Sequence, residues 1–129
     1  MREKKFRAWD RKNKRIFQVY SFDTVDSGCI PRQIKGEGID DLEFVYAADC
    51  DLLEYTGLTD RNGKGICEGD LCRDSTGVSR IVWHDTFASF CLVRKGWLSS
   101  HFFGEAVDPE DVEVIGNIYE NPELLSKEA

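Results

Sequence analysis

The amino-acid sequence predicts a mainly β protein, built as a small barrel or sandwich with a smaller irregular subdomain and short helical turns. Short segments with alternating apolar side chains recur roughly every 10 residues, and glycine-rich turns separate them, as in all-β folds. No stretch of the 129 residues shows the long apolar periodicity of an amphipathic helix. Because 41% of the residues are hydrophobic, the chain can fill a packed interior.

The length of 129 residues is that of one ordinary domain. We expect residues 1–129 to form a single domain with three parts. An N-terminal hairpin and a long loop occupy residues 1–54, a barrel-like β part occupies residues 55–119, and a tail occupies residues 120–129.

The first part of the chain, KKFRAWDRKNKRIFQVY, alternates in residues 5–9 and 16–20, with a polar run around Asn13 between them. This pattern predicts a hairpin. Residues 23–41 carry three glycines and a proline. They predict a long connection with at most a short strand near residues 29–34.

The next segment combines a helical apolar rhythm with the β-prone run EFVY. We expect a short strand in residues 43–46 and a helical turn in residues 49–53. Further on, Asn62 and Gly63 predict a hairpin with a type I′ turn, because that turn needs a positive φ at both central residues.

The tripeptide Glu68-Gly69-Asp70 predicts a break within the strand expected for residues 66–73. Gly69 suits a left-handed or bulged backbone, and Asp70 can accept hydrogen bonds from the amides that such a bend frees. A small SH3-like barrel needs a sharp change of strand direction of this kind. We therefore interpret this tripeptide as structural.

The strand pattern is clearest in the second half of the chain. GVSRIVWHD and FASFCLVRKG alternate and predict two strands. The alternation places Ile81 and Trp83 on one face of the first strand, and Phe90 and Leu92 on one face of the second. GWLSSHFFG and VEVIGNIYEN predict two more strands, and NPELLSKEA predicts a helical turn with Pro122 at its first position.

The glycine- and acid-rich segment YTGLTDRNGKGICEGDLC predicts tight turns and not a ligand site. An EF-hand loop counted from Asp60 would place Lys64 at a calcium-ligand position and Leu71 where a bidentate carboxylate is required. The glycine spacing of a phosphate-binding P-loop is absent, and Cys67 and Cys72 have no second ligand pair at zinc-site spacing. We predict no metal site and no cofactor.

The sequence predicts no catalytic residues. Neighbouring residues on a strand point to opposite faces, so Asp85 cannot orient His84 as the carboxylate of a catalytic triad does. The chain has no Gly-x-Ser-x-Gly elbow. Its five cysteines, an odd number without a secretion signal, suit reduced and mostly buried thiols. We expect a protein that is not an enzyme, with a metal- or thiol-dependent enzyme as the open alternative.

No segment predicts membrane insertion or secretion. No apolar run approaches the roughly 20 residues that cross a bilayer. The charged N-terminus is not followed by the apolar stretch of a signal peptide. We expect a cytoplasmic protein without a membrane partner.

The charge of the chain is divided unevenly along its length. The formal net charge is −7, but residues 1–15 carry +6 and the remainder carries −13. A basic segment with an aromatic residue can track a phosphate backbone and stack a base, or it can neutralise the acidic body of the same or a neighbouring subunit. We favour neutralisation, because the long-range field of the whole chain repels phosphate. The candidate binding residues on this hairpin are Arg7, Trp9, Arg11, Lys12 and Arg15.

Three segments carry a family resemblance: KFRAWD near the N-terminus, YTGLTDRNGKGICEGDLC in the middle and VIGNIYENPELL near the C-terminus. In these segments and in their order, the chain resembles the YopX family of phage and prophage proteins. The resemblance spans nearly the whole chain. It implies a mainly β protein with an SH3-like barrel portion and a smaller irregular part, encoded by a phage or an integrated prophage. It implies no established activity, so no catalytic residue is carried over.

These observations together predict a phage- or prophage-encoded protein of the host cytoplasm that works by binding, foremost to another protein. The partner is either a host or phage protein or a second copy of the chain. A homo-oligomer is expected, because the basic start of one copy can pair with the acidic body of another. The alternative is a nucleic-acid-associated accessory protein that uses the basic hairpin.

Overall fold

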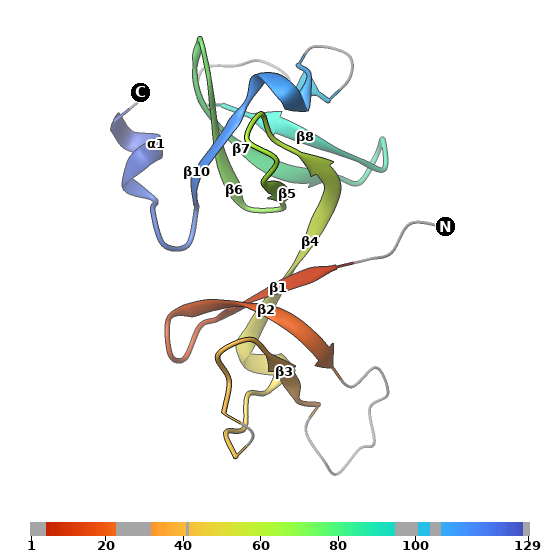
Figure 1. The fold of residues 1–129 in the computed structure, drawn as a ribbon, viewed down its shortest axis with the longest axis vertical. Coiled ribbons are helices and arrows are strands. Elements are labelled where there is room, and N and C mark those ends of the chain that lie inside the picture. The colour runs from red at the N-terminus through yellow and green to blue at the C-terminus, as the bar shows by residue number, and fades with distance from the viewer. Residues whose placement is uncertain (1–4, 23–31, 41, 95–100, 104–106, 128–129) are drawn as a thin grey trace. The chain divides into compact units, whose positions relative to one another are not determined.

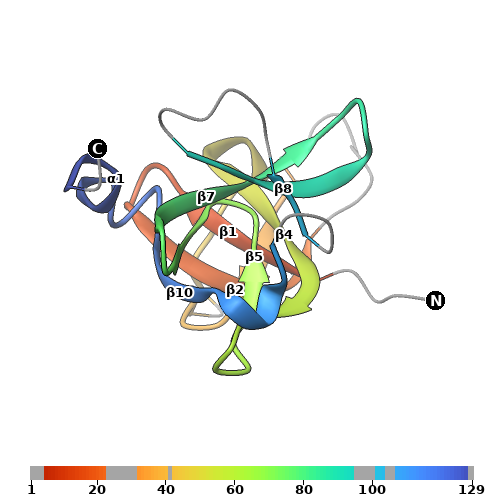
Figure 2. The ribbon, with the colours of Figure 1, turned by 90° about the horizontal axis from the view of Figure 1, so that it is seen from above.

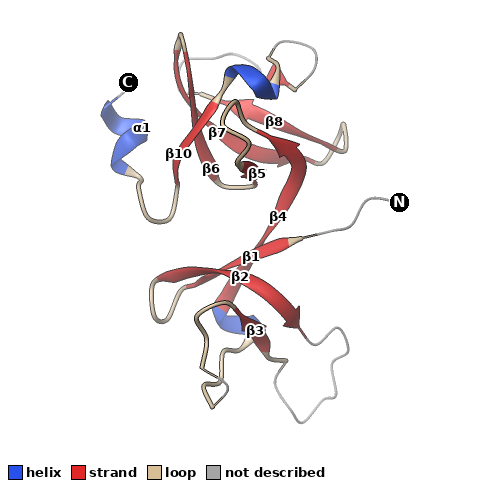
Figure 3. Cartoon of the chain, in the orientation of Figure 1, coloured by secondary structure: helices blue, strands red, loops and turns tan. Residues whose placement is uncertain are grey.

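The computed structural model describes residues 5–22, 32–40, 42–94, 101–103 and 107–127. Strands dominate this part of the chain, and helices are confined to short segments (Figure 3). The strands are β1 (Phe6–Asp10), β2 (Arg15–Phe22), β3 (Ile34–Gly36), β4 (Cys50–Thr59), β5 (Gly65–Cys67), β6 (Asp70–Asp74), β7 (Gly77–His84), β8 (Ser89–Val93), β9 (His101–Phe102) and β10 (Glu113–Asn117). The helical segments are the 3₁₀ turns η1 (Ala47–Asp49) and η2 (Pro109–Asp111) and the α-helix α1 (Glu123–Lys127). The prediction of a mainly β protein with short helical turns is confirmed.

The strands form two antiparallel sheets, in the orders β3-β2-β1-β4-β5 and β10-β6-β7-β8-β9. The contacts divide the chain into two units, of which unit 1 ends at Glu54 and unit 2 begins at Tyr55. Strand β4 contributes to both units (Figure 1), since its first half pairs with β1 and its second half pairs with β5. Neither sheet closes on itself through the described strands, so the sheets are open. Among the described residues, no helix is long and apolar enough to cross a membrane.

Unit 1 is built on the predicted N-terminal hairpin. Strands β1 and β2 pair antiparallel, from Arg7 opposite Gln18 to Asp10 opposite Arg15. The alternation of side chains along both strands turns one face of the hairpin toward the interior. The buried core cluster of this unit consists of Ala8, Phe17, Ile34, Val45 and Cys50. The hairpin prediction is confirmed.

Two expectations for the region before β4 are wrong. Residues 43–46 do not form a strand, and Tyr46 makes an isolated bridge to Gln33. The helical turn expected in residues 49–53 lies earlier, as η1, because Cys50 already begins β4. Pairing with β1 determines this outcome, since strand formation depends more on neighbouring strands than on the local pattern.

Unit 2 has its own hydrophobic core. Its buried core cluster consists of Ile66, Cys72, Ile81, Phe90, Leu92, Val112 and Val114. The predicted strand faces are confirmed, because Ile81, Phe90 and Leu92 all lie in this cluster. Trp83 packs edge-on against Phe90, with the ring centres 4.9 Å apart. The helix α1 contacts β7.

The turns of the glycine-rich segment form where the sequence predicts them. The hairpin after β4 is present, but the prediction of a type I′ turn is wrong. Gly63 has a φ of 80°, whereas Asn62 has no positive φ. The amide of Asp60 bonds to the carbonyl of Lys64 instead and closes a three-residue loop, another common hairpin connection. Gly69, with a φ of 87°, separates β5 from β6, which confirms the predicted break.

The later strands form as predicted, apart from their ends. Strand β8 begins at Ser89 and not at the first residue of FASFCLVRKG, because residues 85–88 form a turn in which Ala88 has a φ of 47°. Strand β10 and the C-terminal helix are present, and α1 starts directly after Pro122. Residues 29–31 of the strand expected near residues 29–34, and the first part of GWLSSHFFG, lie outside the described residues. Of the described residues 32–34, only Ile34 belongs to a strand, as the first residue of β3.

Candidate functional site

The guanidinium groups at the tip of the basic hairpin are bound by carboxylates of unit 1. Arg11 forms an ion pair with Asp51. Arg15 donates to Glu43 Oε2 at 2.6 Å and to Asp10 Oδ2 at 3.2 Å. Part of the basic charge of the hairpin is therefore neutralised within the same unit.

The other three predicted binding residues lie in two different settings. Lys12 is exposed in the β1–β2 turn and makes no ion pair within the described residues. Arg7 and Trp9 are half-buried on the face of β1 opposite to the buried Ala8. Arg7 also lines a shallow hollow of about 280 Å³ with Glu37. The structure thus exposes the turn of the predicted site more than its strand.

The acidic residues of the glycine-rich segment bind backbone amides. The Asp60 carboxylate accepts hydrogen bonds of 2.8–2.9 Å from the amides of Asn62, Lys64 and Val114. Asp70 accepts one of 2.8 Å from the amide of Cys67, which is the role predicted for it. Burial raises the pKa of Asp60, but these amide hydrogen bonds outweigh it and hold the pKa below the ordinary value of 3.8. Both carboxylates therefore hold the turns in place.

The four cysteines among the described residues are buried thiols. Burial, assisted by the charge of nearby Asp70, raises the pKa of Cys72 to about 12. Burial also raises the pKa of Cys50 to about 11. Since the thiolate is the nucleophile and the metal ligand, neither thiol is suited to covalent chemistry at neutral pH.

Three aromatic rings meet at the turn between β7 and β8. The ring centres of His84 and Phe87 lie 5.0 Å apart, those of Phe87 and Phe102 lie 5.5 Å apart, and those of His84 and Phe102 lie 5.6 Å apart. We call these residues the ring cluster. Phe87 is 66% exposed, so a large apolar side chain of this cluster faces solvent. Figure 2 shows the β7–β8 turn at the margin of unit 2.

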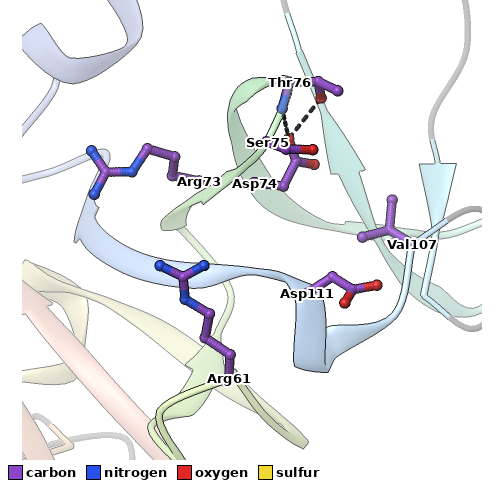
Figure 4. Close-up of a pocket in the computed structure, with 7 residues that line it drawn as sticks. All are labelled: Arg61, Arg73, Asp74, Ser75, Thr76, Val107 and Asp111. Carbon is purple, nitrogen blue, oxygen red and sulfur yellow. Dashed lines mark hydrogen bonds between the residues drawn. The ribbon is translucent and has the colours of Figure 1, made fainter.

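Unit 2 also contains an open polar pocket of about 460 Å³. Its lining residues are Arg61, Arg73, Asp74, Ser75, Thr76, Val107 and Asp111 (Figure 4). They come from the loop after β4, the end of β6 with its following turn, and the region around η2. The pocket therefore collects two arginines, two aspartates and two hydroxyl groups from segments far apart in the sequence.

Sequence reasoning missed both the ring cluster and the pocket. One signal for the ring cluster was present, because Phe87 stands in the run HDTFA between two strands, where an aromatic residue has no core face to occupy. The pocket has no comparable signal. Arg61, Arg73 and Asp111 are separated in the chain and share no motif spacing, so only the folded arrangement brings them together.

Comparison with known proteins gives a family and two similar folds. The family model described as YopX protein matches residues 5–126. No curated protein matches the chain. The crystal structure of protein EF1440 from Enterococcus faecalis is 23% identical, with a TM-score of 0.63, and the alignment covers 97% of this chain and 99% of that one. The crystal structure of protein YopX from Bacillus subtilis is 20% identical, with a TM-score of 0.55, and the alignment covers 94% of this chain and 95% of that one. The chain belongs to the YopX protein family.

Proposed function

We propose that the protein is a non-enzymatic binding protein that recognises another protein through the ring cluster. The observation that carries this proposal is the exposure of Phe87 within a packed group of three rings. Aromatic side chains are enriched at protein–protein interfaces and carry a large share of their binding energy. His84 and Phe102 contact the exposed ring of Phe87. The Phe87 side chain therefore loses little conformational freedom when a partner binds.

The proposal includes the biological setting implied by the family resemblance. We take the protein to be encoded by a phage or prophage and to act in the cytoplasm of the host cell. The buried thiols suit a reducing compartment. We also propose that residues 1–129 work as one domain and that unit 2 has an SH3-like arrangement, for which its antiparallel strands and the bend at Gly69 are the support.

The test is affinity capture of the tagged chain from host cells that carry the phage or prophage, with nuclease treatment of every sample. The variant Phe87→Ser removes the exposed ring. Phe44→Ser is the matched control, because Phe44 is 64% exposed in unit 1 and lies outside the ring cluster. We expect a defined protein to be retained by the native chain and by Phe44→Ser and to be lost from Phe87→Ser. Retention that is equal for both variants contradicts the proposal.

Nucleic-acid association through the basic hairpin is the second candidate, favoured by the exposure of Lys12 in the β1–β2 turn. It predicts binding to single- or double-stranded DNA that weakens steeply as salt rises, because cations of the protein displace counterions from phosphates. The ion pairs of Arg11 and Arg15 with acids of unit 1 reduce the charge left for this role. An undetectable response to both kinds of DNA at low salt removes this candidate.

A further inference from the structure

The polar pocket of unit 2 carries opposite charges on two of its sides. Figure 4 shows Arg61 and Arg73 on one side of the pocket, and Val107 and Asp111 on the other. The volume of about 460 Å³ lies within the range of roughly 300–1,000 Å³ that is typical of ligand sites. A short segment of extended chain can therefore enter it.

Arg61 and Arg73, on one side of the pocket, have more N–H donors than their neighbouring carboxylate, Glu113, can accept. Arg61 Nη2 lies 2.9 Å from Glu113 Oε2, and Arg73 Nη2 lies 3.5 Å from the same oxygen. Each guanidinium has five N–H donors, and the side chains of both arginines are 54% exposed. Because two cations share one carboxylate, this side retains positive charge and donors for a second carboxylate.

The aspartate side of the pocket offers one available carboxylate. Asp74 is already engaged, since it accepts from the amides of Thr76 and Gly77 and pairs with Arg94. Asp111, in contrast, is exposed and makes no side-chain hydrogen bond or ion pair within the described residues. Asp111 is therefore less engaged than Asp74 and is the carboxylate that we expect to receive a cationic group in the pocket.

We propose that this pocket binds a peptide segment of a partner protein that carries one acidic and one basic side chain. The acidic group lies against Arg61 and Arg73, the basic group lies against Asp111, and the chain between them packs on Val107. A purely anionic ligand gains from the arginines but is repelled by Asp111, so the pocket discriminates against it. This site is separate from the ring cluster, and the inference does not depend on the proposed role of that cluster.

The test is a titration of the isotope-labelled full chain, followed by the backbone amide signals in NMR spectra. The probes are acetylated and amidated Glu-(Ala)-Lys peptides with spacers of different length, together with the Gln-(Ala)-Lys and Glu-(Ala)-Gln peptides that lack one charge. Inorganic phosphate is the probe for an anion alone. We expect shifts at the pocket residues with at least one doubly charged peptide, and binding about two- to fivefold weaker for either singly charged peptide, the size of an exposed ion pair.

Two variants assign the charges to the two sides of the pocket. Arg73→Gln is expected to remove the preference for the acidic side chain, and Asp111→Asn to remove the preference for the basic one. Arg80→Gln is the control, because Arg80 is exposed on β7 and does not line the pocket. The proposal is overturned by the absence of shifts with every peptide, by equal binding of all peptides, by tighter binding of phosphate, or by preferences that Asp111→Asn leaves unchanged. Capture through Phe87 can succeed or fail independently of each of these outcomes.

Discussion

At the scale of the single residue, Asp60 joins two segments that are far apart in the chain. One carboxylate oxygen bonds to the amides of Asn62 and Lys64 within its own loop, and the other bonds to the amide of Val114 in β10. Asp60 is 4% exposed. If its carboxylate is removed, these amides lose their hydrogen-bond acceptor, and little water can reach them to replace it. The residue acts as a structural link between the loop after β4 and strand β10.

The substitution Asp60→Asn is expected to lower the free energy of unfolding by about 1–3 kcal/mol, because the new amide group presents N–H donors to backbone donors. Urea unfolding followed by tryptophan fluorescence measures the change. Asp85→Asn is the control, since Asp85 is exposed in the β7–β8 turn, and it should leave the midpoint unchanged. Equal effects of the two substitutions would contradict the role of Asp60.

Acidification is expected to destabilise the fold through three buried or half-buried turn aspartates. Burial raises the pKa of Asp10, Asp60 and Asp74, but hydrogen bonds to each carboxylate outweigh it and hold each pKa below 3.8. A lowered pKa in the folded state contributes stability that is present above the unfolded value and is lost as the pH falls through the folded value. The free energy of unfolding should therefore decline below about pH 5.

Urea unfolding at a series of pH values measures this decline. The variant Asp60→Asn should show a shallower dependence on pH than the native chain, because one of the three carboxylates is missing. A free energy of unfolding that stays constant down to the ordinary pKa of aspartate would show that these carboxylates are not linked to folding.

At the scale of the element, the central and C-terminal family segments fold against each other. The carbonyl of Gly69 accepts a hydrogen bond of 2.9 Å from the amide of Ile118. A Cβ atom on Gly69 would lie 3.1 Å from the ring of Tyr119. Asn117 is buried and accepts from the amides of Tyr119 and Glu120, which shapes the turn before α1. Turn geometry thus accounts for Gly69 and Asn117 in these motifs.

The strands with clear alternation were predictable from the sequence, and the regions decided by pairing were not. In β7 the period of two places Ile81 in the core, and the local pattern is sufficient to say so. Residues 50–53 look equally helical by pattern, and only the pairing with β1 makes them a strand. The polar pocket belongs to the second class, because Arg61 and Asp111 approach each other only after the sheet has formed.

Strand β3 requires glycine at its last position. A Cβ atom on Gly36 would lie 2.2 Å from the carbonyl oxygen of Gln18 and 2.4 Å from the ring of Phe17. Gly36→Ala should therefore destabilise the protein by about 1–3 kcal/mol, as expected for overpacking, because the backbone oxygen cannot rotate away. Thermal unfolding measures the loss, and hydrogen exchange should show increased opening in unit 1.

Gly65→Ala is the matched control in another strand. Its Cβ atom would lie 3.3 Å from the ring of Tyr55, a side chain that can shift, and Gly65 has no positive φ. We expect a loss of less than about 1 kcal/mol. Comparable losses for the two substitutions would mean that the close approach at Gly36 does not limit packing.

At the scale of the whole molecule, the division of charge is the feature that bears on self-association. The chain has a net charge of −7 with a basic start and an acidic remainder. Within unit 1, Arg11 and Arg15 are paired with acids, whereas Lys12 and Lys14 are exposed and make no ion pair among the described residues. Among the described residues of the basic start, the β1–β2 turn therefore offers two exposed cations to a second copy.

If copies pair through this turn, the protein should associate at low salt and dissociate at high salt, because exposed ion pairs are screened. Light scattering at both salt concentrations measures the molar mass. Replacing Lys12 and Lys14 by Gln should favour the monomer at low salt, whereas Arg80→Gln in unit 2 should not. A monomer under all conditions removes the idea of pairing between the basic start and the acidic body.

The loop after β4 has one more consequence, which concerns the outer edge of the sheet in unit 2. Strand β10 is the last strand on its side of that sheet. Its Val114 amide donates to the Asp60 carboxylate, and the carbonyl of Val112, just before the strand, accepts from the Arg61 amide. An edge strand with unpaired backbone N–H and C=O groups is a template to which a strand of another chain can add. By covering two backbone groups at this edge, the loop after β4 leaves fewer free positions for such an addition.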